Sequence, residues 1–212
     1  LPDGKGFYYT RYPEKGSVPP GDEKYGSKVF FHTLGTDPKN DRLVFGEGRK
    51  KTDTPIVQIS PNGRWLIVQV HEGWDKNEVY LQDRQKGESA RFVDVAIGKH
   101  ALFDPIARDQ KLYIVTNDGS PRYRLVETDY ADPSSAHWKD VIPEGEDVLD
   151  SVNVTDDEII ATFLHEASSK VDRFTKTGKK KGSIALPQIG SASVQAPLHG
   201  GEAYVAFSSY AY

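Results

Sequence analysis

Residues 56–71, with the sequence IVQISPNGRWLIVQVH, decide the fold class of this chain. Runs of apolar residues, which alternate with polar ones at Gln58, Ser60, Gln69 and His71, lie on both sides of Pro61-Asn62-Gly63. Alternation with a period of two is typical of half-buried β-strands, and a Pro-Asn-Gly cluster is typical of a tight turn. The stretch therefore predicts one strand over 56–60, a turn, and a second strand over 65–71.

The same alternation continues along the whole chain, whereas helical periodicity is nearly absent. Clusters of Pro, Gly, Asn and Asp, which interrupt a strand ladder, separate runs that are rich in Val, Ile, Tyr, Phe and Thr. The predicted strands cover residues 6–12, 28–34, 42–45, 56–60, 65–71, 79–82, 92–95, 101–103, 112–116, 123–129, 138–142, 148–154, 158–165, 170–175, 183–186, 192–196 and 203–209. An all-β fold is expected.

Turns recur at a regular interval, at Pro61-Asn62-Gly63, Asp109-Gln110, Asp156-Asp157 and Gly200-Gly201. Their spacing of about 44–47 residues matches the ~40–50 residues of one four-stranded propeller blade. A single twisted four-stranded sheet leaves both of its faces exposed. When several such sheets stack around an axis, each covers a face of its neighbour. The spacing therefore predicts a β-propeller with four-stranded antiparallel blades.

The period divides the chain into complete and partial blades. Complete blades are expected at 55–98, 99–147 and 148–189, after a partial blade at 1–54 that lacks its first strand and before a two-stranded partial blade at 190–212. Residues 12–27 are expected to form a long surface loop. The open ends leave two alternatives: a ring completed by residues outside this sequence, or a smaller ring closed by the partial blades. We expect apolar faces on both terminal blades, and hence self-association of the isolated chain.

Composition limits the class of partner. The 212 residues carry a net charge of −4 with both signs interspersed, which argues against nucleic acid. The run Lys179-Lys180-Lys181 is interpreted as a solvated hairpin tip. No stretch approaches the ~20 apolar residues of a membrane span, and no signal peptide is visible. The absence of cysteine excludes disulfides and favours a cytoplasmic protein, although a periplasmic one is also compatible; the absence of Met suggests a fragment.

Motifs for catalysis, cofactors or metals are missing from the sequence. The nearest approach to a Gly-x-Ser-x-Gly elbow is Gly87-Glu88-Ser89, but Arg91 stands where the second glycine belongs. No zinc, calcium, Walker-type or dinucleotide-binding pattern occurs, so neither a cofactor nor a metal is expected. Six aspartates are interpreted as turn residues: Asp104, Asp109, Asp118, Asp132, Asp156 and Asp157.

His71 and Trp74 are the candidate binding residues. His71 ends an apolar predicted strand and leads into Glu72-Gly73-Trp74-Asp75. A histidine and a tryptophan at a strand end can face a cavity, where the indole would stack on a ligand. The alternative is that Trp74 covers the apolar layer between two blades. The other five histidines are expected to be structural or exposed.

An ordered series of segments resembles the prolyl oligopeptidase family. The series consists of residues 3–12 (DGKGFYYTRY), 31–36 (FHTLGT), 59–66 (ISPNGRWL), 73–80 (GWDKNEVY), 116–125 (TNDGSPRYRL) and 138–144 (WKDVIPE). These segments occur in the family's order and extend over essentially the whole chain. The resemblance implies part of a seven-bladed propeller, from within the third blade to within the seventh.

The resemblance also implies a function. Family members are serine peptidases that cleave after proline in short peptides, with a Ser-Asp-His triad on a separate α/β-hydrolase domain that is absent from these residues. The propeller covers that active site and excludes folded proteins. The expected partners are that hydrolase domain, in the same polypeptide, and short proline-containing peptides. This chain alone is expected to be inactive.

Two residues can be carried over from the family. Trp74 stands where family members place a side chain near the bound peptide, and His71 stands where some relatives have a substrate-contacting arginine. That departure removes a fixed positive charge, which a protonated imidazole would restore in part. Arg122 and Arg124 are expected to make structural pairs. A standalone propeller that serves as a protein-binding scaffold remains the alternative function, and a sugar-hydrolysing propeller is disfavoured because the carboxylates cluster in turns.

Overall fold

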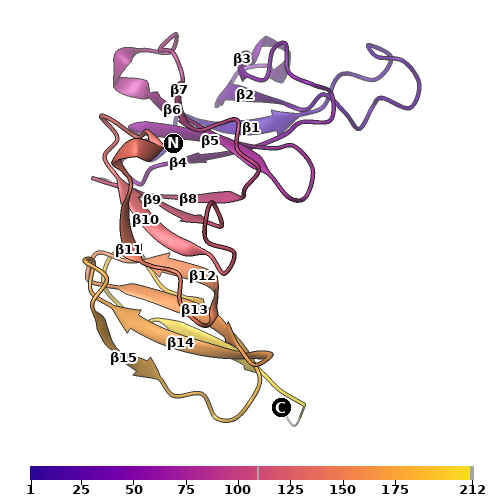
Figure 1. Cartoon of the computed structure of the whole chain (residues 1–212). Coiled ribbons are helices and arrows are strands. Elements are labelled where there is room, and N and C mark those ends of the chain that lie inside the picture. Colours follow the sequence, from indigo (N-terminus) through magenta and orange to yellow (C-terminus); the bar gives the residue numbers. More distant parts are fainter. Residues whose placement is uncertain (109, 211–212) are drawn as a thin grey trace. The chain divides into compact units, whose positions relative to one another are not determined.

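The computed structural model describes residues 1–108 and 110–210. This part of the chain holds seventeen β-strands and three short 3-10 helices, and it contains no α-helix. The strands form one three-stranded, three four-stranded and one two-stranded sheet (Figure 1). The prediction of an all-β fold is therefore confirmed. Two compact units divide the chain, the first of residues 1–112 and 129–137 and the second of residues 113–128 and 138–212.

Two sheets lie wholly in the first unit. The first sheet has the order β1-β2-β3 and the second β4-β5-β6-β7, with every neighbouring pair antiparallel. Residues 12–27 form the long loop between β1 and β2, as predicted. The strands are β1 (Gly6–Arg11), β2 (Lys28–Thr33), β3 (Arg42–Phe45), β4 (Thr54–Ile59), β5 (Trp65–His71), β6 (Asn77–Asp83) and β7 (Val93–Ala96), and the 3-10 helices are η1 (Pro38–Asn40) and η2 (Arg84–Lys86).

The core of the first unit forms where these two sheets pack face to face. Val29 of β2 and Val68 and Val70 of β5 are fully buried there, with Tyr8 and Phe45 packed against them. In β5, consecutive residues 66–68 are all buried, so side chains on both faces of this strand are covered. Covering both faces of a sheet is what gives β5 its nearly continuous apolar sequence.

The third sheet has the order β11-β10-β9-β8. Its strands are β8 (Phe103–Ala107), β9 (Leu112–Thr116), β10 (Arg124–Thr128) and β11 (Lys139–Ile142), and η3 (Ser135–His137) precedes β11. All five residues of β9 are buried. Strand β8 lies at the edge of this sheet, where the missing N–H of Pro105 leaves the ladder intact.

The last two sheets lie in the second unit. The fourth has the order β12-β13-β14-β15 and the fifth pairs β16 with β17, all antiparallel. Ile160, Val171 and Val194 are the buried residues of the core that these two sheets share. The strands are β12 (Val148–Val154), β13 (Ile159–His165), β14 (Ser168–Phe174), β15 (Lys180–Ile184), β16 (Ser191–Gln195) and β17 (Tyr204–Ser208).

The turn between β4 and β5 shows why its sequence stops one strand and starts the next. The amide of Gly63 donates to the Ser60 carbonyl at 2.8 Å, and Gly63 has a φ of 74° that favours glycine. The Asn62 side-chain oxygen accepts from the Ser60 hydroxyl at 2.7 Å and from the Arg64 amide at 3.0 Å. Because these side chains satisfy the turn's polar groups, the chain reverses directly into β5.

The structure corrects two local predictions and leaves part of a third outside the described residues. Asp104 lies within β8 and not in a turn, since β8 extends through Pro105 to Ala107. Lys180 and Lys181 begin strand β15 and are not a hairpin tip; the Lys180 ammonium binds Asp172 at 2.8 Å, and that of Lys181 binds Glu158. In the predicted Asp109-Gln110 turn, Asp109 lies outside the described residues. Lysines on an edge strand such as β15 protect its free edge.

Candidate functional site

The two predicted binding residues belong to one hairpin, in which residues 72–76 join β5 to β6. The Glu72 amide donates to the Lys76 carbonyl at 3.1 Å, and Gly73 turns the chain with a φ of 99°. The Glu72 carboxylate accepts from the ammonium groups of Lys50 at 3.2 Å and Lys76 at 3.3 Å. The hydrogen bond from Lys50, and to a smaller extent that from Lys76, lowers the pKa of Glu72, whereas burial would raise it. The base of the hairpin is therefore fixed by ion pairs.

Trp74 stands at the tip of this hairpin, with 98% of its surface exposed. Its ring contacts no other aromatic side chain or cation in the described part of the chain. Beside it, the Asp75 carboxylate and His100 Nε2 lie 3.0 Å apart. The alternative that Trp74 covers an apolar layer between sheets is wrong for the described residues. An indole exposed to this extent is available to stack on a ligand.

His71 is the last residue of β5 and pairs across the sheet with Thr54 and Asn77. Its ring makes no hydrogen bond within residues 1–108 and 110–210. Asp104 is its charged neighbour: burial among surrounding protein atoms raises the pKa of the Asp104 carboxyl, and the charge of His71 opposes that shift. Asp104 is nevertheless exposed to solvent. Asp104 is therefore a solvent-exposed carboxyl whose charge and that of His71 act on each other at this end of β5.

Asn77 brings Asp104 to His71. Asn77 is 1% exposed; its amide nitrogen donates to the Phe103 carbonyl at 2.8 Å, and its oxygen accepts from the Phe103 amide at 2.7 Å. Gln69 donates to the same carbonyl at 2.8 Å. These bonds connect the start of β8 to the last residues of β5 and to the first residue of β6. Sequence reasoning missed both Asp104 and Asn77, because the contacts that position them join residues 26 apart.

The groups at this site can bind a polar, partly apolar ligand. The exposed indole offers a stacking surface, the imidazole can donate or accept hydrogen bonds, and the Asp104 carboxyl can accept them. No group of three or more His, Cys, Asp or Glu side chains is arranged to hold a metal ion within the described residues. Nor does any helix of this part of the chain have the length and apolar character needed to cross a membrane.

One cluster does contain a serine, a histidine and an aspartate. His137 Nδ1 lies 3.1 Å from the Ser134 hydroxyl and 3.0 Å from the Asp132 carboxylate. A catalytic triad needs the serine on one ring nitrogen and the aspartate on the other. Here both partners meet the same nitrogen, and the three residues belong to one exposed turn that leads into β11. The arrangement is a local turn and not a nucleophile with its base.

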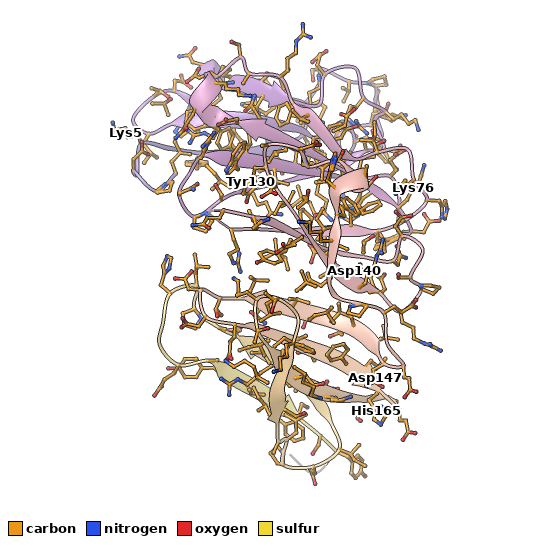
Figure 2. The ribbon with its side chains drawn as sticks, turned by 60° about the vertical axis from the view of Figure 1, so that its left-hand side comes forward. Lys5, Lys76, Tyr130, Asp140, Asp147 and His165 are labelled. Carbon is orange, nitrogen blue, oxygen red and sulfur yellow. The ribbon has the colours of Figure 1, made fainter. Side chains whose placement is uncertain are left out.

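A second histidine ends the corresponding strand of the fourth sheet. His165 Nδ1 lies 2.6 Å from the Asp147 carboxylate (Figure 2). The same carboxylate binds Lys170 Nζ at 2.8 Å. The hydrogen bond with Asp147 raises the pKa of His165. The two residues of the turn that follows, Glu166 and Ala167, have φ values of 45° and 61°, which non-glycine residues rarely adopt.

The sequence predicts structural pairs for Arg122 and Arg124. Arg124 binds Asp140 at 3.1 Å, whereas the Arg122 side chain has no partner within the described residues.

Comparison with known proteins agrees with this architecture. The family model of the prolyl oligopeptidase N-terminal β-propeller domain matches residues 1–212. The prolyl endopeptidase of Elizabethkingia meningoseptica is 31% identical over 193 residues, which cover 89% of this chain and 27% of that protein. Prolyl oligopeptidase A of Galerina marginata is 22% identical over 205 residues, covering 91% of this chain and 28% of that protein.

Solved structures give the same result. A structure from a study of two prolyl endopeptidases superposes with a TM-score of 0.91 at 31% identity and covers 99% of this chain and 31% of its own. Prolyl oligopeptidase B of Galerina marginata, bound to a 25mer macrocyclization substrate, gives a TM-score of 0.87 at 21% identity, covering 97% of this chain and 29% of its own. The chain thus spans less than a third of the length of these relatives. Its match over every residue shows that the chain belongs to the prolyl oligopeptidase family, as a β-propeller domain with antiparallel four-stranded sheets.

Proposed function

We propose that this chain is the non-catalytic propeller portion of a prolyl oligopeptidase-type serine peptidase, and that it controls which peptides reach the active site. The match of the propeller family model to residues 1–212 carries this proposal. In the proposed enzyme a separate α/β-hydrolase domain of the same polypeptide supplies the serine, the histidine that activates it and the aspartate that orients the histidine. The propeller contributes selection by size, because side chains and blades leave only a narrow passage along its axis.

The proposed substrates are short proline-containing peptides, cleaved on the carboxyl side of proline. Support comes from the relatives named prolyl endopeptidase, at 31% and 30% identity over 89% of this chain. An extended peptide has no tertiary structure to lose and can pass a narrow channel, whereas a folded protein has to unfold first and so opposes entry by its free energy of unfolding.

Two measurements test the proposed function. The purified 212-residue chain should not hydrolyse a short Gly-Pro reporter peptide, whereas the natural polypeptide that contains it should. The natural polypeptide should also cleave a free peptide of about ten residues far faster than the same sequence within a folded domain, whose unfolding has to precede entry. Turnover by the chain alone, or equal rates on the free and the folded substrate, contradicts the proposal. A natural polypeptide with a mass near 23.6 kDa would instead favour the standalone scaffold.

We infer that Trp74 and His71 contact the peptide in that enzyme. The indole is 98% exposed at the tip of a hairpin with a fixed base, so it can stack on an apolar or prolyl side chain without rearrangement. The imidazole, next to the partly desolvated carboxyl of Asp104, can hydrogen-bond to a peptide amide. Both contacts bind substrate and its transition state alike, so their loss should act on KM.

Trp74→Ala is expected to raise KM for a proline-containing peptide by about 2- to 12-fold with little change in kcat, the range that an aromatic stacking energy of ~0.5–1.5 kcal/mol predicts. Ile189→Ala is the matched control, because Ile189 is 83% exposed in the loop between β15 and β16. His71→Ala should raise KM as well, and His71→Arg should restore it. Steady-state kinetics of the natural polypeptide measure KM and kcat for each variant. An unchanged KM for Trp74→Ala, or an equal effect of Ile189→Ala, would contradict the proposed contact between Trp74 and the peptide.

A further inference from the structure

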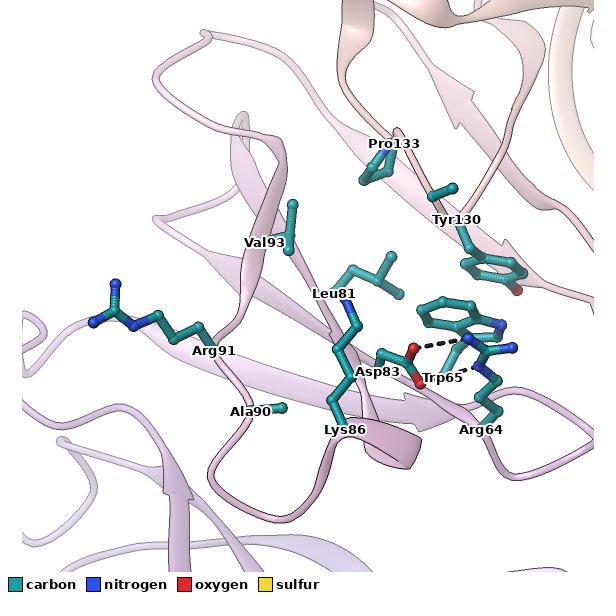
Figure 3. A pocket seen from close by; sticks show the side chains of 11 residues that line it. Arg64, Trp65, Leu81, Asp83, Lys86, Ala90, Arg91, Val93, Tyr130 and Pro133 are labelled. Carbon is teal, nitrogen blue, oxygen red and sulfur yellow. Dashed lines mark hydrogen bonds and ion pairs between the residues drawn. The ribbon is translucent and has the colours of Figure 1, made fainter.

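A cleft of about 570 Å³ lies in the first unit (Figure 3). It is at the end of β5 opposite to His71 and Trp74. It begins at Trp65, the first residue of β5, whereas His71 is the last. Seven residues of strand span roughly 20 Å, so this cleft is separate from the site proposed above. Its lining comes from β5 and the turn before it, β6, η2, β7 and the loop before it, and the loop after β10. The residues are Arg64, Trp65, Leu81, Asp83, Lys86, Ala90, Arg91, Val93, Tyr130, Ala131 and Pro133.

One wall of the cleft is a rigid aromatic stack. The rings of Trp65 and Tyr130 are parallel within 8°, with centroids 4.5 Å apart. The Tyr130 hydroxyl donates to the Arg108 carbonyl at 2.6 Å and accepts from the Arg108 amide at 3.1 Å, which fixes the ring from behind. Leu81 and Val93 add apolar surface on the other side. The wall is therefore formed before any ligand arrives, so that binding costs little rearrangement.

The charges of the lining are unequally paired. The Arg64 guanidinium makes two hydrogen bonds to the Asp83 carboxylate, at 3.0 and 2.8 Å, and lies over the Trp65 ring at 4.4 Å. The hydrogen bond from Arg64 lowers the pKa of Asp83, whereas burial would raise it. Both side chains are therefore ionised, and their opposite charges cancel.

Lys86 carries the charge that remains in the cleft. Within the described residues its ammonium makes no hydrogen bond and no ion pair. Figure 3 shows its side chain extending from η2 toward Leu81, into the space between Val93 and Trp65. Arg91 also lines the cleft, but its guanidinium points away from the other labelled side chains (Figure 3). The cleft therefore combines an apolar aromatic wall with the ammonium of Lys86, whose charge acts on the Asp83 carboxylate but which makes no hydrogen bond or ion pair within the described residues.

We propose that this cleft binds an apolar carboxylate, with its apolar group against Val93 and the edge of Trp65 and its carboxylate on the Lys86 ammonium. Pockets of about 300–1,000 Å³ with a mostly apolar lining and a few polar groups are typical of small-ligand sites. One ammonium suits a singly charged carboxylate, whereas a phosphate would require more donors. Two sources supply this chemistry: a small aromatic acid, and the C-terminal carboxylate of a peptide that ends in an apolar residue.

Calorimetric titration of the purified protein tests the proposal and distinguishes the two sources. The probes are 3-phenylpropionate for the small acid and acetyl-glycyl-phenylalanine for the peptide terminus, each compared with its uncharged amide. At least one acid should bind with a Kd near or below about 1 mM, the range that ligands of this size reach. Its amide should bind at least about tenfold more weakly, because it loses the charge-assisted bond to Lys86. Which acid binds identifies the source.

Two variants locate the site. Lys86→Glu should weaken binding of the acid by about tenfold or more, because it replaces an attractive charge by a repulsive one. Lys24→Glu is the matched control with the same change of charge, since Lys24 is exposed and does not line the cleft; it should leave Kd within about twofold. Val93→Glu at the opposite wall should weaken binding as well.

Three outcomes would overturn the proposal: no binding of either acid at about 10 mM, equal binding of acid and amide, or an unchanged Kd for Lys86→Glu. Thermal unfolding of each variant establishes that it is folded. If Lys86→Glu does not fold, Lys86→Met, which keeps the length of the side chain and removes its charge, provides the same test.

Discussion

At the scale of single residues, Arg49 joins the connection between β3 and β4 to β6 through a network of three hydrogen bonds. It lies in the connection between β3 and β4, with only 22% of its side chain exposed. Its guanidinium donates to Asp53 at 2.9 Å, to Glu78 at 2.7 Å and to the Tyr80 hydroxyl at 3.0 Å. Burial, and then the hydrogen bond to Glu78, raises the pKa of Tyr80 to about 12. One cation thus serves two largely buried carboxylates and fastens the connection to β6.

Arg49→Ala is expected to lower the free energy of unfolding by about 2–3 kcal/mol, because it leaves the carboxylates of Asp53 and Glu78 without their cation. Arg49→Lys should recover only part of this loss, since an ammonium cannot reproduce the planar fork of three bonds. Urea unfolding followed by circular dichroism gives the values.

The matched comparison for Arg49 is an exposed pair of the same unit. Lys28 and Glu47 lie 2.7 Å apart with 34% and 74% of their side chains exposed. Exposed pairs contribute little, so Lys28→Ala should change the free energy of unfolding by less than about 0.5 kcal/mol. Equal effects of the two alanine variants would show that the Arg49 network does not stabilise the connection.

At the scale of elements, the turn between β14 and β15 fixes one sheet against the next. Gly178 has a φ of 83°, and its amide donates to the Thr175 carbonyl at 2.9 Å. A β-carbon added at Gly178 would clash with the carbonyl of Val141 in β11. The turn therefore approaches the backbone of the neighbouring sheet so closely that only glycine fits.

Gly178→Ala should destabilise the chain by about 3 kcal/mol, from the strain of a positive φ together with displaced backbone. Gly87→Ala separates the two effects, because Gly87 has a φ of 97° and open space around its α-carbon. It should cost only the ~1–2 kcal/mol of the strain itself. Denaturant unfolding of both variants checks the difference, and equal losses would show that the contact with Val141 is unimportant.

The sequence predicts strands well where a turn motif bounds them and less well at sheet edges. β5 was predicted at its observed bounds because Ser60 to Gly63 form a turn whose side chains satisfy the backbone. β8 and β15 begin or end two to four residues from their predicted limits. Pro105 and the lysines of β15 are poor strand formers by composition, but edge positions tolerate them. Edge position depends on tertiary structure and cannot be read from local alternation.

The same reason limits what could be predicted of the candidate site. His71 and Trp74 lie in one hairpin, so local alternation and a turn residue were enough to select them. Local pattern places Asp104 in a turn because aspartate is typical of turns. Its place beside His71 depends on the bonds between Asn77 and Phe103, which no local pattern encodes.

At the scale of the whole molecule, the two terminal sheets differ in the faces that they leave free. The face of β1–β3 turned away from β4–β7 is aromatic: Phe7 and Leu43 are 44% and 38% exposed, and Phe7 packs on His32 with ring centroids 5.2 Å apart. The expectation of an apolar face holds for this sheet. It is wrong for β16–β17, whose exposed residues are mostly small or polar: Ser191, Ser193, Gln195, Tyr204, Ala206 and Ser208.

This difference predicts how the isolated chain self-associates. Contact between two β1–β3 faces would remove Phe7 and Leu43 from water, whereas the β16–β17 face offers only Tyr204 as a large apolar group. Phe7→Lys should therefore weaken self-association by about tenfold or more, because each copy would bring a charge into the contact. Tyr204→Lys, which likewise replaces an aromatic ring by a charge, at a position of the other terminal sheet that is 66% exposed, should have little effect. Sedimentation equilibrium over a range of concentrations measures both, and a monomeric native chain or a larger effect of Tyr204→Lys would place the association elsewhere.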